Sequence, residues 1–242
     1  MAYVKAWSAW APGVASPPEW AEWADGRRSI ERSEAAPSLG HLPTLFKRRL
    51  SQLSRMVLHV GHELGPGPRE IKTVYASEYG EICQQLKLTK SLIDTGEIAP
   101  SAFSLSVFNT PVALLSMAEK NTDRTIALNA GPASFETALW EALAMQEHSG
   151  NPDVMVIAAD EKIPAPLDEL ASGGNVPYAL GFLLCAGPGN GAVRLGLEMD
   201  FGEGRIPQEE ALPSGLRFLR WFLGDRLEPL ALGHAECRLL KE

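Results

Sequence analysis

The sequence places its clearest candidate for a reactive turn between residues 128 and 139. An apolar run ends at Asn129, a turn contains Gly131 and Pro132, and a helical pattern begins at Ala133. At such a strand-to-helix turn, backbone N–H groups and the helix dipole would favour an attacking group that carries negative charge. Neither glycine nor proline has a side chain that can attack, so the turn itself lacks a nucleophile.

Ser134 is the residue next to this turn that has a nucleophilic side chain. An independent serine acyl hydrolase or transferase could use it with Asp160 and one of His41, His148 or His234. The residues around Ser134 do not form the Gly-x-Ser-x-Gly pattern of many such enzymes. A serine at the start of a helix is also typical of a capping residue. The capping role is therefore favoured, and the hydrolase is kept as an alternative.

Patterns for metals and cofactors are weak. His59 and His62 stand three apart in a helical pattern, a spacing that metal sites use, but the sequence places no third ligand near them. Cys83, Cys185 and Cys237 are far apart and lack zinc-ligand spacing. We therefore expect no metal, no cofactor and no disulfide.

Composition and charge exclude several classes of protein. The chain has 242 residues, of which 45% are hydrophobic, and this is enough to bury the core of a single domain over residues 1–242. A net charge of -8 argues against a nucleic-acid-binding surface. Its apolar runs are too short for a membrane-spanning helix, and its N-terminus does not resemble a signal peptide. We expect a cytoplasmic protein.

Apolar periodicity predicts an α/β chain. Residues 125–129 and 154–159 are compact apolar strands on either side of a helical pattern, which predicts parallel pairing by a right-handed crossover. Residues 16–40 form an irregular segment that we expect to be pinned to the body by Trp20 and Trp23. Other strands are expected at 1–10, 71–77, 179–185, 193–199 and 230–239, with helices at 44–64, 83–95, 102–119, 133–148 and 214–223. Residues 187–191 predict a hairpin between the strands on either side of them.

Around the turn, the sequence resembles the β-ketoacyl synthases of the thiolase-like superfamily. Asn129-Ala130-Gly131-Pro132-Ala133-Ser134 aligns with the family's Asp-Thr-Ala-Cys-Ser-Ser, which puts Pro132 where the acyl-accepting cysteine would stand. Residues 75–81 look like the end of the family's second strand. Residues 101–110 look like its Ser-Val-His-Asn segment, with Phe108 in place of the histidine, and residues 156–161 are similar to its Gly/Ala-rich strand with a following acidic residue.

The resemblance covers residues 2–188 and corresponds to the first half of a complete synthase. The two histidines of the second half, which assist decarboxylation and condensation, have no counterpart here. The chain therefore looks like the short chain length factors of aryl polyene pathways. The implied fold is a thiolase-like half with a mixed, mostly parallel five-stranded sheet covered by helices and extended by C-terminal strands. The implied role is non-catalytic, in fatty acid or polyketide biosynthesis.

The resemblance also implies a partner and a contact surface. The partner would be a full-length ketosynthase, with an acyl carrier protein as a further candidate, and the alternative is a degenerate homodimer that acts as a scaffold. A long apolar edge strand would otherwise invite uncontrolled association. The residues implied at this contact or in the acyl tunnel are Phe103, Phe108, Leu114, Thr125, Ile126, Ala127, Leu128 and Asn129. Phe103 and Phe108 fit a packing role equally well.

Overall fold

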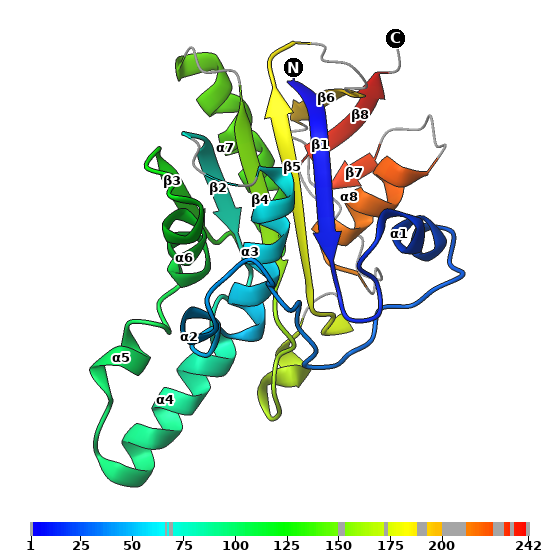
Figure 1. Cartoon of the computed structure of the whole chain (residues 1–242). Helices are drawn as coiled ribbons and strands as arrows, with labels where there is room; N and C mark the ends of the chain where they lie inside the picture. Colours follow the sequence, from blue (N-terminus) through cyan, green and yellow to red (C-terminus); the bar gives the residue numbers. More distant parts are fainter. Residues whose placement is uncertain are drawn as a thin grey trace.

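The computed structural model of the chain describes residues 2–65, 67, 70–149, 153–171, 174–187, 193–199, 212–224, 230–232 and 235–240. Its strands are β1 (Ala2–Trp10), β2 (Lys72–Ala76), β3 (Thr125–Leu128), β4 (Val154–Asp160), β5 (Tyr178–Cys185), β6 (Val193–Met199), β7 (Leu230–Leu232) and β8 (Ala235–Leu240). Its helices are α1 (Pro17–Ala24), α2 (Thr44–Lys47), α3 (Gln52–Leu64), α4 (Ile82–Thr95), α5 (Pro100–Phe103), α6 (Thr110–Glu119), α7 (Ser134–Ser149) and α8 (Ser214–Leu223). Figure 1 shows the helices arranged around one twisted sheet.

The strands form a mixed sheet in the order β3-β2-β4-β5-β1-β6-β8-β7. Parallel pairing joins β2 to β3 and to β4, so β3 and β4 run parallel as expected, with β2 between them. The α/β class, the mixed five-stranded part and its C-terminal extension are confirmed. Parallel pairing is less extensive than expected, because β5 pairs antiparallel with both β4 and β1. The connection from β4 to β5 contains a short 3-10 turn (Leu167–Leu170) and no crossover helix.

The hairpin expected around residues 187–191 is wrong, because β1 lies between the two strands. Val4 of β1 pairs with Leu184 of β5 on one side and with Val193 of β6 on the other. Of the connecting segment itself, residues 188–192 lie outside the described residues. The last expected strand is two strands, since β7 and β8 form an antiparallel pair. Sequence periodicity cannot reveal an insertion of this kind, since the inserted strand comes from the other end of the chain.

Two layers of helices cover the sheet. Helices α3 and α6 pack on one face over a core that includes Met56, Val60 and Ile157. Helices α7, α8 and α1 pack on the opposite face, where Phe182 and Phe218 are buried. Figure 1 also shows α4 and α5 projecting beyond the edge of the sheet. Among the described residues, no helix is both long enough and apolar enough to cross a lipid bilayer.

Two expected helices are each divided by a local break. The helix expected at 44–64 is α2 followed by α3, because the Ser51 side chain accepts a hydrogen bond from the Ser54 backbone N–H and caps α3. The helix expected at 102–119 is α5 followed by α6. Pro111 stands in the first turn of α6, where its missing N–H costs nothing.

The segment at 16–40 is less irregular than expected, because it begins with α1. Pro17 lies in the first turn of this helix, and a Glu19 carboxylate oxygen accepts hydrogen bonds from the backbone N–H groups of Ala15 (3.0 Å) and Ser16 (2.9 Å). The expected anchoring by tryptophan is confirmed. Trp20 and Trp23 are buried, and the Trp20 indole donates to the Ala9 carbonyl oxygen at 2.9 Å.

Candidate functional site

The expected strand-to-helix junction is present where β3 leads into α7. Gly131 has a φ of +59°, a conformation that side chains disfavour, and its N–H donates to the Asn129 side-chain oxygen at 2.8 Å. Pro132 follows with its side chain exposed. The Asn129 amide donates to the Glu78 carbonyl oxygen at 2.7 Å, so the turn is tied to the loop after β2. In the turn itself, the exposed side chain is therefore one without reactive atoms.

Ser134 begins α7 and is buried in a local hydrogen-bond network. Its hydroxyl donates to the Gly131 carbonyl oxygen at 2.6 Å and accepts from the Ala130 N–H at 2.9 Å. A longer contact of 3.4 Å reaches the Ser77 carbonyl oxygen. These contacts close the turn that leads into α7. The hydroxyl accepts from Ala130, which precedes the helix, so a capping role for Ser134 stays a prediction.

Asp160 ends β4 and holds the loop that follows β2. Its Oδ1 accepts hydrogen bonds from the Ser77 hydroxyl (2.7 Å) and from the N–H groups of Glu78 (2.9 Å) and Tyr79 (3.0 Å). Burial raises the pKa of Asp160 to about 7, against the lowering effect of these donors. Asp160 and Ser134 are thus both linked to Ser77.

Of the three histidines considered for a Ser134 triad, the structure describes the side chain of His41, and this side chain lies away from Ser134. His41 lies close to Glu119, which is the last residue of α6 and precedes the start of β3 by a few residues. Ser134, by contrast, follows the carboxyl end of β3. His41 and Ser134 therefore lie at opposite ends of the parallel strands. The side chain of His148 and all of His234 lie outside the described residues.

Two more buried carboxyl groups, Glu81 and Glu161, lie in the segments that follow β2 and β4, and no local sequence pattern predicts that they are close. Glu81 precedes α4, and its Oε1 accepts from the hydroxyl groups of Ser51 (2.8 Å) and Ser54 (2.6 Å). Its Oε2 is buried with no hydrogen-bond partner among the described residues. Glu161 accepts from the Cys83 N–H at 2.9 Å. Burial raises the pKa of Glu81 to about 7 and also raises the pKa of Glu161.

The three residues expected in a tunnel occupy different environments. Phe108 is half-buried with its ring 5.9 Å from that of Tyr75, and it lies so close to Gly80 that a Cβ there would come within 2.8 Å of the ring. Phe103 lies on α5 and is 57% exposed. Leu114, by contrast, lines a cavity.

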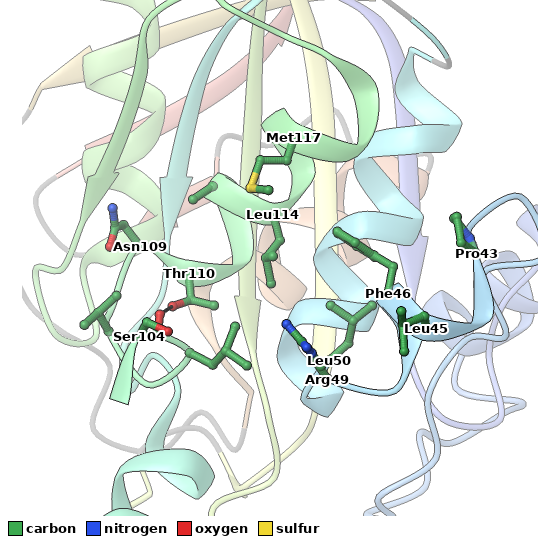
Figure 2. A pocket seen from close by; sticks show the side chains of 13 residues that line it. Pro43, Leu45, Phe46, Arg49, Leu50, Ser104, Asn109, Thr110, Leu114 and Met117 are labelled. Atoms are coloured by element: carbon green, nitrogen blue, oxygen red, sulfur yellow. Dashed lines mark hydrogen bonds between the residues drawn. The ribbon is translucent and has the colours of Figure 1, made fainter. Parts of the chain in front are cut away.

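This cavity has a volume of about 660 Å³ and lies between α2 and the segment that runs through α6 (Figure 2). It is lined by Pro43, Leu45, Phe46, Arg49, Leu50, Ser104, Leu105, Val107, Asn109, Thr110, Ala113, Leu114 and Met117. Leu45 and Met117 are 70% and 68% exposed, so apolar surface continues from the cavity to the outside of the molecule. A wall of this composition fits an apolar chain or apolar side chains better than a polar ligand.

Apolar exposure also continues along the projecting helices. Ile93 on α4 is 78% exposed, and Leu92 and Ile98 are also exposed. In the sheet, β3 ends the order of the strands, with β2 as its neighbour on one side. Exposed apolar side chains and an edge strand are typical features of protein contact surfaces.

A family model described as the N-terminal domain of β-ketoacyl synthases matches residues 20–231. Among solved structures, a chain from the complex of the ketosynthase ApeO with its chain length factor ApeC, from Xenorhabdus doucetiae, is 25% identical with a TM-score of 0.82. That match covers 100% of both chains. No curated protein matches the sequence significantly.

Two more distant structures share the fold. The ishigamide ketosynthase/chain length factor is 14% identical with a TM-score of 0.66, and the match covers 84% of this chain and 69% of that chain. A β-ketoacyl synthase from Burkholderia phymatum is 12% identical with a TM-score of 0.60, and the match covers 85% of this chain and 66% of that chain.

The buried carboxyl groups predict that stability falls as pH rises. Glu81 and Asp160 have folded-state pKa values raised to about 7, so between about pH 4.5 and 7 the folded protein binds more protons than the unfolded chain. Their stabilising contribution is complete at acidic pH and is lost as pH rises through 7. Glu81→Gln keeps the acceptor for Ser51 and Ser54 and should remove on the order of 3 kcal/mol of this pH dependence. The free energy of unfolding, measured by urea denaturation at several pH values, checks this prediction.

The matched control is Glu34→Gln, which neutralises an exposed carboxylate. This variant should keep the pH dependence of the parent. Equal slopes for the parent and the Glu81 variant would show that Glu81 carries no buried charge above pH 7.

Proposed function

Because the chain belongs to the family of β-ketoacyl synthase N-terminal domains, we propose that it is a non-catalytic partner subunit of a ketosynthase. Its role is that of a chain length factor: it pairs with a full-length ketosynthase and shapes the tunnel that holds the growing acyl chain. The pathway is a fatty acid or polyketide pathway of the aryl polyene type, in which an acyl carrier protein presents the substrate to the complex. The chain acts there as a single domain over residues 1–242, in the cytoplasm.

The observation that carries this proposal is Pro132 at the junction of β3 and α7. Residues 129–134 adopt the strand-to-helix turn at which the family resemblance puts an acyl-accepting cysteine. Pro132 offers no lone pair or acidic proton that could be used for acyl transfer. The hydroxyl of Ser134 is engaged within the turn, so it does not replace the missing thiol.

The surface of the chain supports a protein partner. Edge strand β3 and the exposed apolar side chains on α2, α4 and α6 provide backbone hydrogen-bonding groups and apolar area. The similarity to a chain from a complex of a ketosynthase with its chain length factor supports a ketosynthase as that partner. In this proposal, residues 125–129 pair with the partner.

The cavity supports a contribution to the acyl tunnel. Leu114 reaches the cavity from α6, opposite Phe46 and Leu50 (Figure 2). The partner would close the open side of this cavity, and Leu114 would then limit the length of the chain that enters. Phe108 contributes indirectly, since its ring packs inward against Tyr75. Phe103 is assigned to the contact surface because of its exposure.

The alternatives are weaker. A serine hydrolase would need a histidine beside Ser134, and His41 lies at the opposite end of the parallel strands. A homodimeric scaffold would use the same surface with a second copy of the chain. Measurement of the mass of the purified complex separates that arrangement from the heterodimer.

The first test is complex formation with a ketosynthase encoded beside this chain. We expect an equimolar complex after co-expression, measured by size exclusion with light scattering. Leu45→Glu combined with Met117→Glu puts charge on the exposed apolar surface and should weaken the complex by roughly 30-fold or more, because charge at the centre of an apolar interface is costly.

The matched control is Arg27→Glu, which adds the same side chain at an exposed position beside α1. It should leave the affinity unchanged, as measured by biolayer interferometry. Two proteins that remain separate, or a parent chain that forms only homodimers in the presence of the ketosynthase, would rule the proposal out.

A second test concerns chain length. In the reconstituted complex, Leu114→Ala enlarges the wall of the cavity and should shift products to longer chains, whereas Leu114→Trp fills it and should shorten them. Mass spectrometry of carrier-bound products measures the distribution. Leu223→Ala makes the same chemical change on α8, on the opposite face of the sheet from the cavity, and should leave the distribution as it was. Identical products from both Leu114 variants would remove this residue from the tunnel.

A further inference from the structure

A cluster of two histidines and one glutamate lies apart from the proposed tunnel. His41 comes from the loop before α2, His62 from the end of α3 and Glu119 from the end of α6. One ligand atom from each residue lies within 4.8 Å of the other two. The sequence could not reveal this group, because its members are separated by more than 20 residues in each case.

The packing of α3 against α6 brings the helix-borne members together. Gly61 faces Leu115, and a Cβ at this glycine would collide with the leucine side chain. The absence of that Cβ allows α6 to lie close to α3, so Glu119 reaches the histidine that follows Gly61. His62 Nδ1 and Glu119 Oε1 are 2.8 Å apart. The second oxygen of Glu119 accepts from the Gly67 N–H at 2.7 Å, which fixes the carboxylate.

His41 completes the group from the solvent side. Its ring stacks on that of His62, with centroids 3.6 Å apart and an angle of 6° between the planes. Glu119 is buried and His41 is exposed, so the cluster has a rigid base and an adjustable outer member. Imidazole nitrogen atoms and a carboxylate oxygen are ligands that zinc and similar divalent ions prefer.

We propose that His41, His62 and Glu119 form a binding site for a divalent transition metal ion, zinc by preference, with water as the fourth ligand. Two imidazoles and a carboxylate give a set of three protein ligands, which tetrahedral zinc sites with an open position use. The ion takes the place of the hydrogen bond between His62 Nδ1 and Glu119 Oε1, and a neutral His62 that binds through Nδ1 carries its one ring proton on Nε2. The site does not depend on the proposed function.

The geometry requires only a small rearrangement. Ligand atoms around tetrahedral zinc are about 3.3 Å apart, given metal–ligand distances of about 2.0–2.1 Å. The His62–Glu119 pair therefore has to widen by about 0.5 Å from its 2.8 Å separation. His41 leaves the parallel stack, and its exposed side chain is free to rotate toward the ion.

The surrounding charges favour a neutral His41, which is the form that binds metals. Burial lowers the pKa of His41, and His62 and Lys47 lower it further, while Glu119 and Glu63 act in the opposite direction. The two glutamates would offset the charge of a divalent ion. Once bound, the ion would fasten the loop before α2 to both α3 and α6. The loop leads into Pro43, which lines the cavity described above, so the metal would also hold that wall of the cavity in place.

The experiment uses the full chain with its affinity tag removed and metals stripped by chelation. Titration calorimetry with zinc sulfate should show one site, and a saturating excess should raise the Tm by about 5–10 °C. His41→Ala changes an exposed residue, so it should fold normally and bind zinc at least roughly 10-fold more weakly. Glu119→Gln should reduce affinity more strongly, since it removes the anionic ligand.

His59→Gln is the matched control, because His59 lies on α3 outside the three-residue cluster and should leave zinc affinity unchanged. Absence of binding by the parent chain, or equal affinity in the His41 variant, would reduce the cluster to a hydrogen-bonded contact and overturn the proposal.

Discussion

The parallel pairing of β2 with both β3 and β4 is the constraint on which the site depends. Parallel strands end at the same edge of a sheet, so the loop after β2, the turn after β3 and the carboxylate of Asp160 after β4 meet there. Ser77 links them, because its hydroxyl donates to Asp160 and its carbonyl oxygen lies 3.4 Å from the Ser134 hydroxyl. A change in register at any of these strands would separate the groups.

Local signals in the sequence predict much of this arrangement. The apolar runs at β3 and β4 and the helical pattern of α7 are strong, and the strand-to-helix junction between them is confirmed. The sequence also carried a signal for α1 that the irregular interpretation missed, since Ser16-Pro17-Pro18-Glu19 combines a capping serine, prolines and an acidic first turn. A break such as that at Ser51 is harder to predict, because apolar spacing continues across it.

Contacts between distant segments account for what the sequence could not predict. The insertion of β1 between β5 and β6 joins the two ends of the chain. Glu81 looks like an ordinary surface acid between a glycine and a helix, yet hydroxyl groups from the start of α3 enclose it. Helix α3 offers no carboxylate ligand that the sequence would pair with His62 at a metal site. The packing of α3 on α6 places Glu119 beside His62. Burial and pKa changes of this kind follow from tertiary packing, which local periodicity does not contain.

The turn after β3 has a structural role that is independent of any nucleophile. Asn129 ties it to the Glu78 carbonyl oxygen, and Ser134 closes it through Ala130 and Gly131. Removal of a reactive side chain from an exposed turn position costs little stability, whereas loss of these hydrogen bonds would loosen the turn between β3 and α7. Because β3 is the edge strand of the sheet, its position also sets the geometry of any subunit contact at that edge. The junction is therefore held by its own hydrogen bonds and does not depend on the side chain at position 132.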